Sequence, residues 1–243
     1  MVTWNHVRRL PRSLRYHLKR LWHFRGRRWP APKLTSLPRR NCYVAFIDLL
    51  SFGSKVAQDV DGALGAYDEI FREIREMSPW WFQSTTIAVV SDSVFLTSMT
   101  LPEIVLACRY IQQSAIFNAV LVRGAITHGV HVEARHTQSL FVVSPALVQA
   151  VRIAHSIDHP SIVLDSALEV PLSFYPHAGM DPFERWLFFY EGCWVVSPFF
   201  PYFSHSTRSR ISHMMGADPE HKSKYEWFLG LYKAVTAGEK LLP

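Results

Sequence analysis

Blocks of apolar and polar residues along the chain predict a mixed α and β fold. Cys42–Leu50 is a continuous apolar run with one aspartate near its end, which is typical of a central buried strand. Apolar residues then recur at helical spacing over about 61–77, which predicts a helix with one buried face. The next predicted elements are strands over 85–90 and 93–98 that meet at Ser91-Asp92, a helix over 102–118, strands over 120–127 and 139–143 joined by a polar loop, and a helix over 144–157 with Pro145 in its first turn.

This order, β-α-β-β-α-β, is the split βαβ arrangement of a ferredoxin-like sheet. Beyond it the pattern predicts a strand over 161–164, a short helix or loop from about 168, an aromatic hairpin over 186–196 and a last helix over 219–237. We therefore predict an α+β fold with an antiparallel-rich sheet. Its parts are a basic N-terminal arm (1–40), a core (41–165) and a C-terminal extension of the same domain (166–243).

Composition narrows the class of protein. The 243 residues are 49% hydrophobic and 14% aromatic, which excludes a disordered chain. The longest apolar stretches are shorter than the ~20 residues of a membrane-spanning helix, so we expect a soluble protein without a transmembrane segment. Three widely spaced cysteines and an arginine-rich start without an apolar signal core favour the reducing cytoplasm.

The net charge of +6 is unevenly distributed. Residues 1–40, the basic arm, hold twelve Lys and Arg and no acid, so the rest of the chain is net negative. Leucines alternate with the arginines and would form one side of an amphipathic helix. Such a helix could contact an anionic membrane, nucleic acid or another acidic surface. It could equally be a solvated extension that docks its leucines on its own domain or on a sister subunit.

Two aspartates stand at predicted strand ends. Asp48 and Asp92 each lie in an otherwise apolar sequence, where an unpaired carboxylate costs several kcal/mol. In a ferredoxin-like sheet the first strand lies beside the second hairpin, so the two carboxylates would converge. Convergent carboxylates form an oxygen-ligand site for Mg²⁺ or Mn²⁺, and such sites usually bind phosphates. The alternative for each is a turn aspartate that caps backbone amides.

Other polar residues leave alternatives open. The turn Leu50-Ser51-Phe52-Gly53 follows Asp48 and could present backbone N–H groups to an anion, although it matches neither the P-loop nor the dinucleotide fingerprint. Arg123 could contact a phosphate or pair with an acid across strands. Three histidines, His128, His131 and His136, suggest zinc, but we expect them to be exposed loop residues.

Four segments together resemble the class III nucleotidyl cyclases, in the same order as in that family. They are Phe46-Ile47-Asp48-Leu49-Leu50-Ser51-Phe52, Ser91-Asp92-Ser93, Arg123-Gly124-Ala125-Ile126-Thr127-His128-Gly129 and Ser144–Arg152. The resemblance covers about residues 41–157. Within that family, the segments most resemble the pyrimidine cyclases of bacterial anti-phage (Pycsar) systems.

The resemblance implies roles by position. Asp48 and Asp92 match the two metal aspartates, with Leu49 supplying a backbone carbonyl, and Arg152 matches the transition-state arginine. The turn at residues 50–53 would bind phosphates and Phe46 would lie near the nucleotide. Val148 stands where the family has an asparagine. Two further departures are apolar residues at base-reading positions, Ala88 in place of a lysine and Phe141 in place of an aspartate.

These departures favour a small base, so the resemblance implies a uridylate or cytidylate cyclase with two Mn²⁺ or Mg²⁺ ions per site. It further implies a homodimer with its sites between subunits, a nucleoside triphosphate substrate, and a cyclic product that activates a separate anti-phage effector. The resemblance does not distinguish UTP from CTP as the substrate. Two rival hypotheses are a purine cyclase or degenerate nucleotide-sensing domain on the same fold, and a nucleic-acid-binding protein that uses its basic arm.

Overall fold

The computed structural model describes residues 36–50, 52, 56–57, 59–81, 84–136, 139–175, 177, 179–238 and 242. Within these ranges the side chains of residues 73–75, 77–81, 135, 136, 139 and 220 are not described. Residues 39–243 form one compact unit. The basic arm lies outside the described residues as far as residue 35, so its predicted roles stay predictions.

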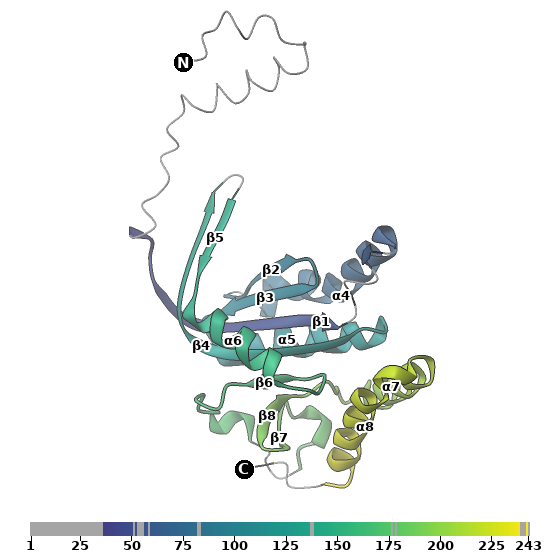
Figure 1. Cartoon of the computed structure of the whole chain (residues 1–243). Coiled ribbons are helices and arrows are strands. Elements are labelled where there is room, and N and C mark those ends of the chain that lie inside the picture. The colour runs from purple at the N-terminus through teal and green to yellow at the C-terminus, as the bar shows by residue number, and fades with distance from the viewer. Residues whose placement is uncertain are drawn as a thin grey trace, which may run out of the picture. The chain divides into compact units, whose positions relative to one another are not determined.

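The elements follow the predicted order through residue 164 (Figure 1). They are β1 (Arg40–Leu50), α4 (Val60–Trp81), β2 (Thr86–Val90), β3 (Ser93–Ser98), α5 (Leu101–Phe117), β4 (Leu121–His136), β5 (Ser139–Val143), α6 (Pro145–Ser156) and β6 (Ile162–Leu164). The C-terminal part adds β7 (Leu187–Tyr190), β8 (Cys193–Val196), α7 (Ser204–Ala217) and α8 (Lys222–Thr236). None of the helices in the described ranges is long and apolar enough to cross a membrane.

The strands form one eight-stranded sheet in the order β2-β3-β1-β4-β6-β8-β7, with β5 paired to β4. Its first four strands have the spatial order of a ferredoxin-like sheet. Only the pairing of β4 with β6 is parallel among the described ladders. The predicted α+β fold with an antiparallel-rich sheet is therefore confirmed.

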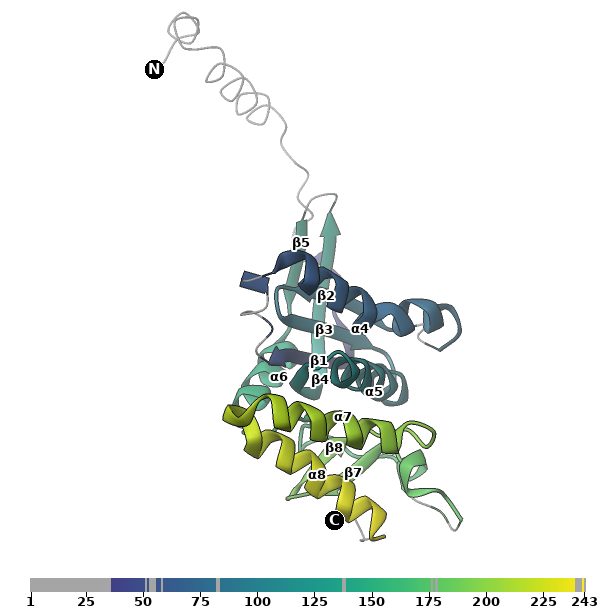
Figure 2. The ribbon, with the colours of Figure 1, turned by 90° about the vertical axis from the view of Figure 1, so that its right-hand side faces the viewer.

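Alternation along β1 divides the core between two faces of the sheet. Ala45, Ile47 and Leu49 pack into the large core beneath α4 and α5, which Figure 2 shows lying across that face. Phe46 points to the other face and packs against Ala150 and its neighbours on α6. Asp48 follows Phe46 by two residues, so its side chain emerges on the α6 face.

Local capping places α6 where the sequence predicted it. The Ser144 side chain accepts a hydrogen bond from the Leu147 N–H at 3.1 Å, and Pro145 occupies the first turn. The alanines that recur every four residues, Ala146, Ala150 and Ala154, are buried. These small buried residues let α6 approach the sheet closely. The polar residues of α6 face outward.

β4 corrects one prediction. The sequence predicted a strand ending at residue 127 and then a polar loop, whereas β4 continues to His136 and pairs with β5 from Val132 onward. His128 and His131 consequently lie on a strand, and His131 is 6% exposed. The residues from Val130 to Ala134 alternate apolar and polar, which is a strand pattern for a hairpin with two different faces. The expectation of a loop was therefore wrong for all three histidines, and the expectation of exposure was wrong for His131.

α7 was not predicted. Its sequence is mostly polar, so it carries little helical periodicity, and only Ser204, Thr207, Ile211 and Met214 are buried. It packs with α8 and with Ile116 of α5 in a small core of its own. α8 begins at Lys222 rather than at 219 because residues 219–221 form a 3₁₀ turn.

Candidate functional site

The register of the sheet brings the two predicted aspartates together. Asp48 lies opposite Ser93 in the pairing of β1 with β3. The Leu49 N–H donates to the Asp92 carbonyl oxygen at 2.8 Å. Ser91 begins the connecting turn with φ of 57°, a left-handed conformation that closes the hairpin tightly. The main chain of Asp92 is thereby held at the end of β1, next to Leu49 and one residue from Asp48.

Asp48 has a cationic partner in the chain itself. Its Oδ2 accepts from Arg123 Nη2 at 3.1 Å, and the two residues lie directly opposite each other on β1 and β4. The Asp48 and Arg123 side chains are 20% and 26% exposed, so water reaches the pair only partly. Arg123 thus takes the acid-pairing role left open by the sequence. It is also within reach of any ligand bound at Asp48.

Gly124 fixes how closely the two strands approach. A Cβ atom on Gly124 would lie 2.5 Å from the main-chain oxygen of Phe46, a distance that real contacts do not show. Only glycine allows β1 and β4 to lie at this separation. The position of Arg123 opposite Asp48 depends on it.

Asp92 has a different environment. Its carboxylate has no hydrogen bond or ion pair with another described residue. Burial, and next the negative charge of Asp92, raise the pKa of Tyr67 on α4. The Tyr67 hydroxyl is buried without a partner in the described part of the chain, and its ring packs 4.5 Å from that of Phe52. A cation bound at Asp92 would relieve this unpaired negative charge.

The donor set fits a divalent cation. Two carboxylates are hard oxygen ligands of the kind that Mg²⁺ and Mn²⁺ prefer. Among the described residues, no three or more His, Cys, Asp and Glu side chains converge on one point. The remaining ligands would come from water, main-chain oxygens or a phosphate substrate.

The predicted phosphate turn is described only in part. Ser51 and Gly53 lie outside the described residues, so their predicted roles stay predictions. Phe52 is 1% exposed within the large core, and half-buried Leu50 packs against the α7–α8 core. In the described structure these two apolar side chains anchor the turn rather than line a surface.

A groove of about 170 Å³ lies on the α6 face of the sheet. Ala88 lines it, and its base-reading role stays a prediction, whereas Phe141 lies on the other face of the β4–β5 hairpin from Val142. Two polar residues that sequence analysis did not assign to a nucleotide site also line the groove. They are His131 and Glu133, whose Nε2 and Oε2 atoms are 3.5 Å apart. The full lining is Val44, Thr86, Ala88, Val90, Phe95, Thr97, His131, Glu133, Leu140, Val142 and Leu147.

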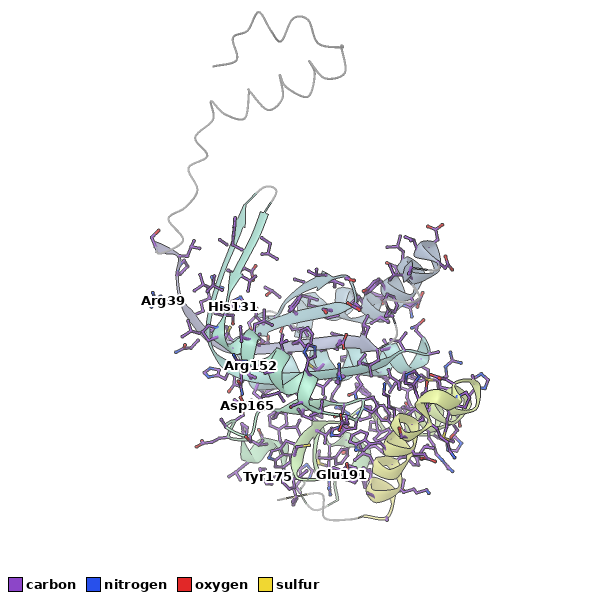
Figure 3. The ribbon with its side chains drawn as sticks, viewed as in Figure 1. Arg39, His131, Arg152, Asp165, Tyr175 and Glu191 are labelled. Carbon is purple, nitrogen blue, oxygen red and sulfur yellow. The ribbon has the colours of Figure 1, made fainter. Side chains whose placement is uncertain are left out.

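Arg152 stands on the outer side of α6 (Figure 3). It is exposed, and no hydrogen bond or ion pair joins it to a described residue, the aspartates included. Val148, one turn earlier, is 51% exposed. His155, one turn later, packs edge-on against Phe46 at 5.9 Å between ring centroids. Within the described chain Arg152 therefore makes no hydrogen bond or ion pair with Asp48 or Asp92.

No family model and no curated protein matches the chain. Its structural neighbours are nucleotidyl cyclase domains. The guanylyl cyclase domain of the RhoGC fusion protein from the aquatic fungus Blastocladiella emersonii is 11% identical, with a TM-score of 0.43, over 54% of this chain and 82% of that chain. The adenylyl cyclase from P. aeruginosa is 13% identical, with a TM-score of 0.42, over 54% of this chain and 79% of that chain. Similarity at this level concerns the fold alone.

Proposed function

We propose that the protein is a pyrimidine nucleotide cyclase that converts UTP or CTP to the 3′,5′-cyclic nucleotide and diphosphate. The observation that supports the proposal is the pairing of β1 with the β2–β3 hairpin, in which the main chain of Asp92 is hydrogen-bonded to that of Leu49, the residue after Asp48. The Asp48 carboxylate accepts from Arg123, and the Asp92 main chain lies at the same end of β1. In this proposal the two aspartates hold a cation that binds the triphosphate.

Cyclisation forms a bond from the ribose 3′-oxygen to the α-phosphorus and breaks the bond to the β-phosphate, so the protein must position groups and neutralise charge. Divalent ions held by Asp48 and Asp92 would polarise the 3′-hydroxyl and screen the triphosphate. Arg123 can release Asp48 and donate to a phosphate oxygen, since its guanidinium suits both anions.

Arg152 acts on the partner's site in this proposal. Its side chain is exposed and unpaired within the described chain, which suits a residue that reaches across a homodimer. There it would hold the charge that grows on the α-phosphate oxygens. The Val148 side chain cannot donate a hydrogen bond, so the transition state would depend more heavily on the arginine.

The groove supports the choice of a small base. Ala88 gives it an apolar wall where the family that the chain resembles has a lysine, so no charged side chain reads a base at that position. The proposal further places the enzyme in the cytoplasm, with its cyclic product acting on a separate anti-phage effector. The anti-phage part of the proposal rests on the resemblance of the four sequence segments to the Pycsar cyclases.

A second candidate function is a nucleotide-sensing domain without turnover. The ion pair between Arg123 and Asp48 and the valine at position 148 favour it, because both weaken the catalytic set. One experiment separates the cyclase from the nucleotide-sensing domain. Purified protein is incubated with each of the four ribonucleoside triphosphates and Mn²⁺, and products are identified by mass. A cyclic pyrimidine nucleotide supports the cyclase, a cyclic purine nucleotide overturns the base assignment, and binding without product supports the sensor.

A further inference from the structure

Arg109 is a buried cation in the middle of α5. It is 2% exposed, and no ion pair joins it to a carboxylate of the described residues. Buried guanidinium groups are normally paired with an acid, because removing an ionic charge from water is costly. Burial lowers the pKa of Arg109 to about 9. No carboxylate of the described residues therefore neutralises this positive charge.

Main-chain carbonyls hold two of the three guanidinium nitrogens. Nε donates to the Ser197 oxygen at 3.2 Å, and Nη2 donates to the Phe199 oxygen at 2.6 Å. Nη1 has no hydrogen-bond partner among the described residues. It is also not among the fully buried side-chain nitrogens without a partner, so it is not fully enclosed and part of its surface is accessible. Arg109 lines a pocket in the described part of the chain.

This pocket has a volume of about 270 Å³. Aromatic rings flank the guanidinium in it: the Arg109 Cζ lies 4.2 Å from the ring centroid of Phe200 and 5.7 Å from that of Trp186. Leu106 adds an apolar wall, and the exposed Glu184 also lines the pocket. The pocket thus combines flat apolar walls with one available donor on a buried positive charge.

We propose that the pocket at Arg109, Trp186 and Phe200 binds a small carboxylate that carries a flat apolar body, such as an aromatic acid. The carboxylate accepts from Arg109 Nη1 and compensates its charge, a charge-assisted hydrogen bond. The rings of Trp186 and Phe200 contact the flat body. The negative charge of Glu184 in the lining disfavours ligands with two or more negative charges relative to a monocarboxylate.

The proposed ligand would not compete with a nucleotide. α5 packs on the face of the sheet opposite α6, whereas Asp48 and the groove lie on the α6 face. The proposal therefore stands apart from the proposed reaction, and either can fail alone.

Isothermal titration calorimetry of the full chain with two probes tests it. The probes are 2-naphthoate and its neutral analogue 2-naphthylmethanol, which share the flat ring system and differ in charge. We expect 2-naphthoate to bind at one site and the alcohol to bind about tenfold more weakly or worse, because only the acid compensates Arg109. Equal affinities, or no binding of 2-naphthoate at millimolar concentration, would overturn the proposal.

Two variants locate the site. Arg109→Gln should abolish binding of 2-naphthoate, but it also removes the links to Ser197 and Phe199 and can prevent folding. In the unmodified chain the Asp181 N–H donates to Glu184 Oε2 at 3.2 Å. Glu184→Gln keeps an oxygen that can accept this hydrogen bond and removes a negative charge from the pocket. It should tighten 2-naphthoate binding by about threefold and leave the alcohol unchanged.

The matched control is Glu226→Gln on α8, an exposed acid paired with Lys222, which should change neither affinity. An unchanged or weakened 2-naphthoate affinity in Glu184→Gln contradicts the proposal, as does full binding by a folded Arg109→Gln protein. Glu184→Gln gains affinity, an outcome that misfolding cannot produce.

Discussion

The Asp48 carboxylate and the Arg123 guanidinium are joined by a 3.1 Å hydrogen bond between directly opposed residues of β1 and β4. The pair is partly shielded from water, so its attraction is stronger than that of a surface ion pair. A divalent cation at Asp48 must compete with Arg123 for the same carboxylate. Metal binding and the release of Arg123 are therefore coupled, and a triphosphate favours both by offering Arg123 another anion.

Removing Arg123 should strengthen metal binding in the absence of nucleotide. We expect Arg123→Met to bind Mn²⁺ about tenfold more tightly than the unmodified chain, because the competing cation is gone. Electron paramagnetic resonance of free Mn²⁺ measures this directly. Arg208→Met removes an equal charge from α7 and should leave the affinity unchanged. An Arg123→Met protein that is folded and binds Mn²⁺ no more tightly would refute the competition.

Gly124 should be irreplaceable for stability. We expect Gly124→Ala to lower the free energy of unfolding by about 2 kcal/mol or more, because the new Cβ would press on the Phe46 carbonyl. Urea denaturation measures the change. Gly65→Ala on α4 is the control, since nothing lies within 4 Å of its Cβ, and it should be neutral or stabilise by up to about 1 kcal/mol. Equal effects at both positions would show that the strand separation is not restrictive.

Glu103 should stabilise the chain in a pH-dependent way. Burial alone would raise its pKa, but hydrogen bonds from Ser84, Ser98 and Thr85 to Oε2 outweigh burial and lower it. Because the folded pKa is lower than the unfolded one, its contribution is complete above about pH 4.3 and is lost as the pH falls through the folded pKa.

The variant Glu103→Ala should therefore cost about 1–2 kcal/mol near pH 7 and progressively less below pH ~4. Urea denaturation at a series of pH values measures the difference from the unmodified chain. A cost that is the same at pH 3 and pH 7 would contradict the assignment of the stabilising form to the carboxylate.

Ala88 should limit the size of the base. We expect Ala88→Leu to lower kcat/KM for the pyrimidine triphosphate about tenfold or more, because the larger side chain fills the groove. Val89→Leu is the matched control: it is the neighbouring residue, 43% exposed, and points to the other face of β2. Steady-state kinetics measure kcat/KM for both variants. Equal losses would place the base elsewhere.

Sequence patterns predicted the elements whose periodicity and capping are strong. β1, α5 and α6 lie within two residues of their predicted bounds, because their apolar residues match one buried face and Ser144-Pro145 marks a helix start. α7 was missed because packing on α5 and α8, not an apolar stripe, stabilises it. The end of β4 was missed because a hairpin with two partly exposed faces looks polar in sequence.

The candidate site was predictable in its parts but not in its contacts. Asp48 and Asp92 stand out because a carboxylate is costly in an apolar run. The choice of Arg123 as partner for Asp48 depends on the register of two strands far apart in sequence, which local patterns do not determine. For the same reason Val142, rather than Phe141, lines the groove.

A Mn²⁺ titration of the unmodified chain, Asp48→Asn and Asp92→Asn, each with the proposed nucleotide present, tests the shared cation site most directly. Both substitutions keep the shape of the side chain and remove its charge. The account predicts that each variant, still folded by circular dichroism, binds Mn²⁺ at least about tenfold more weakly than the unmodified chain. Undiminished Mn²⁺ affinity in either variant would contradict it.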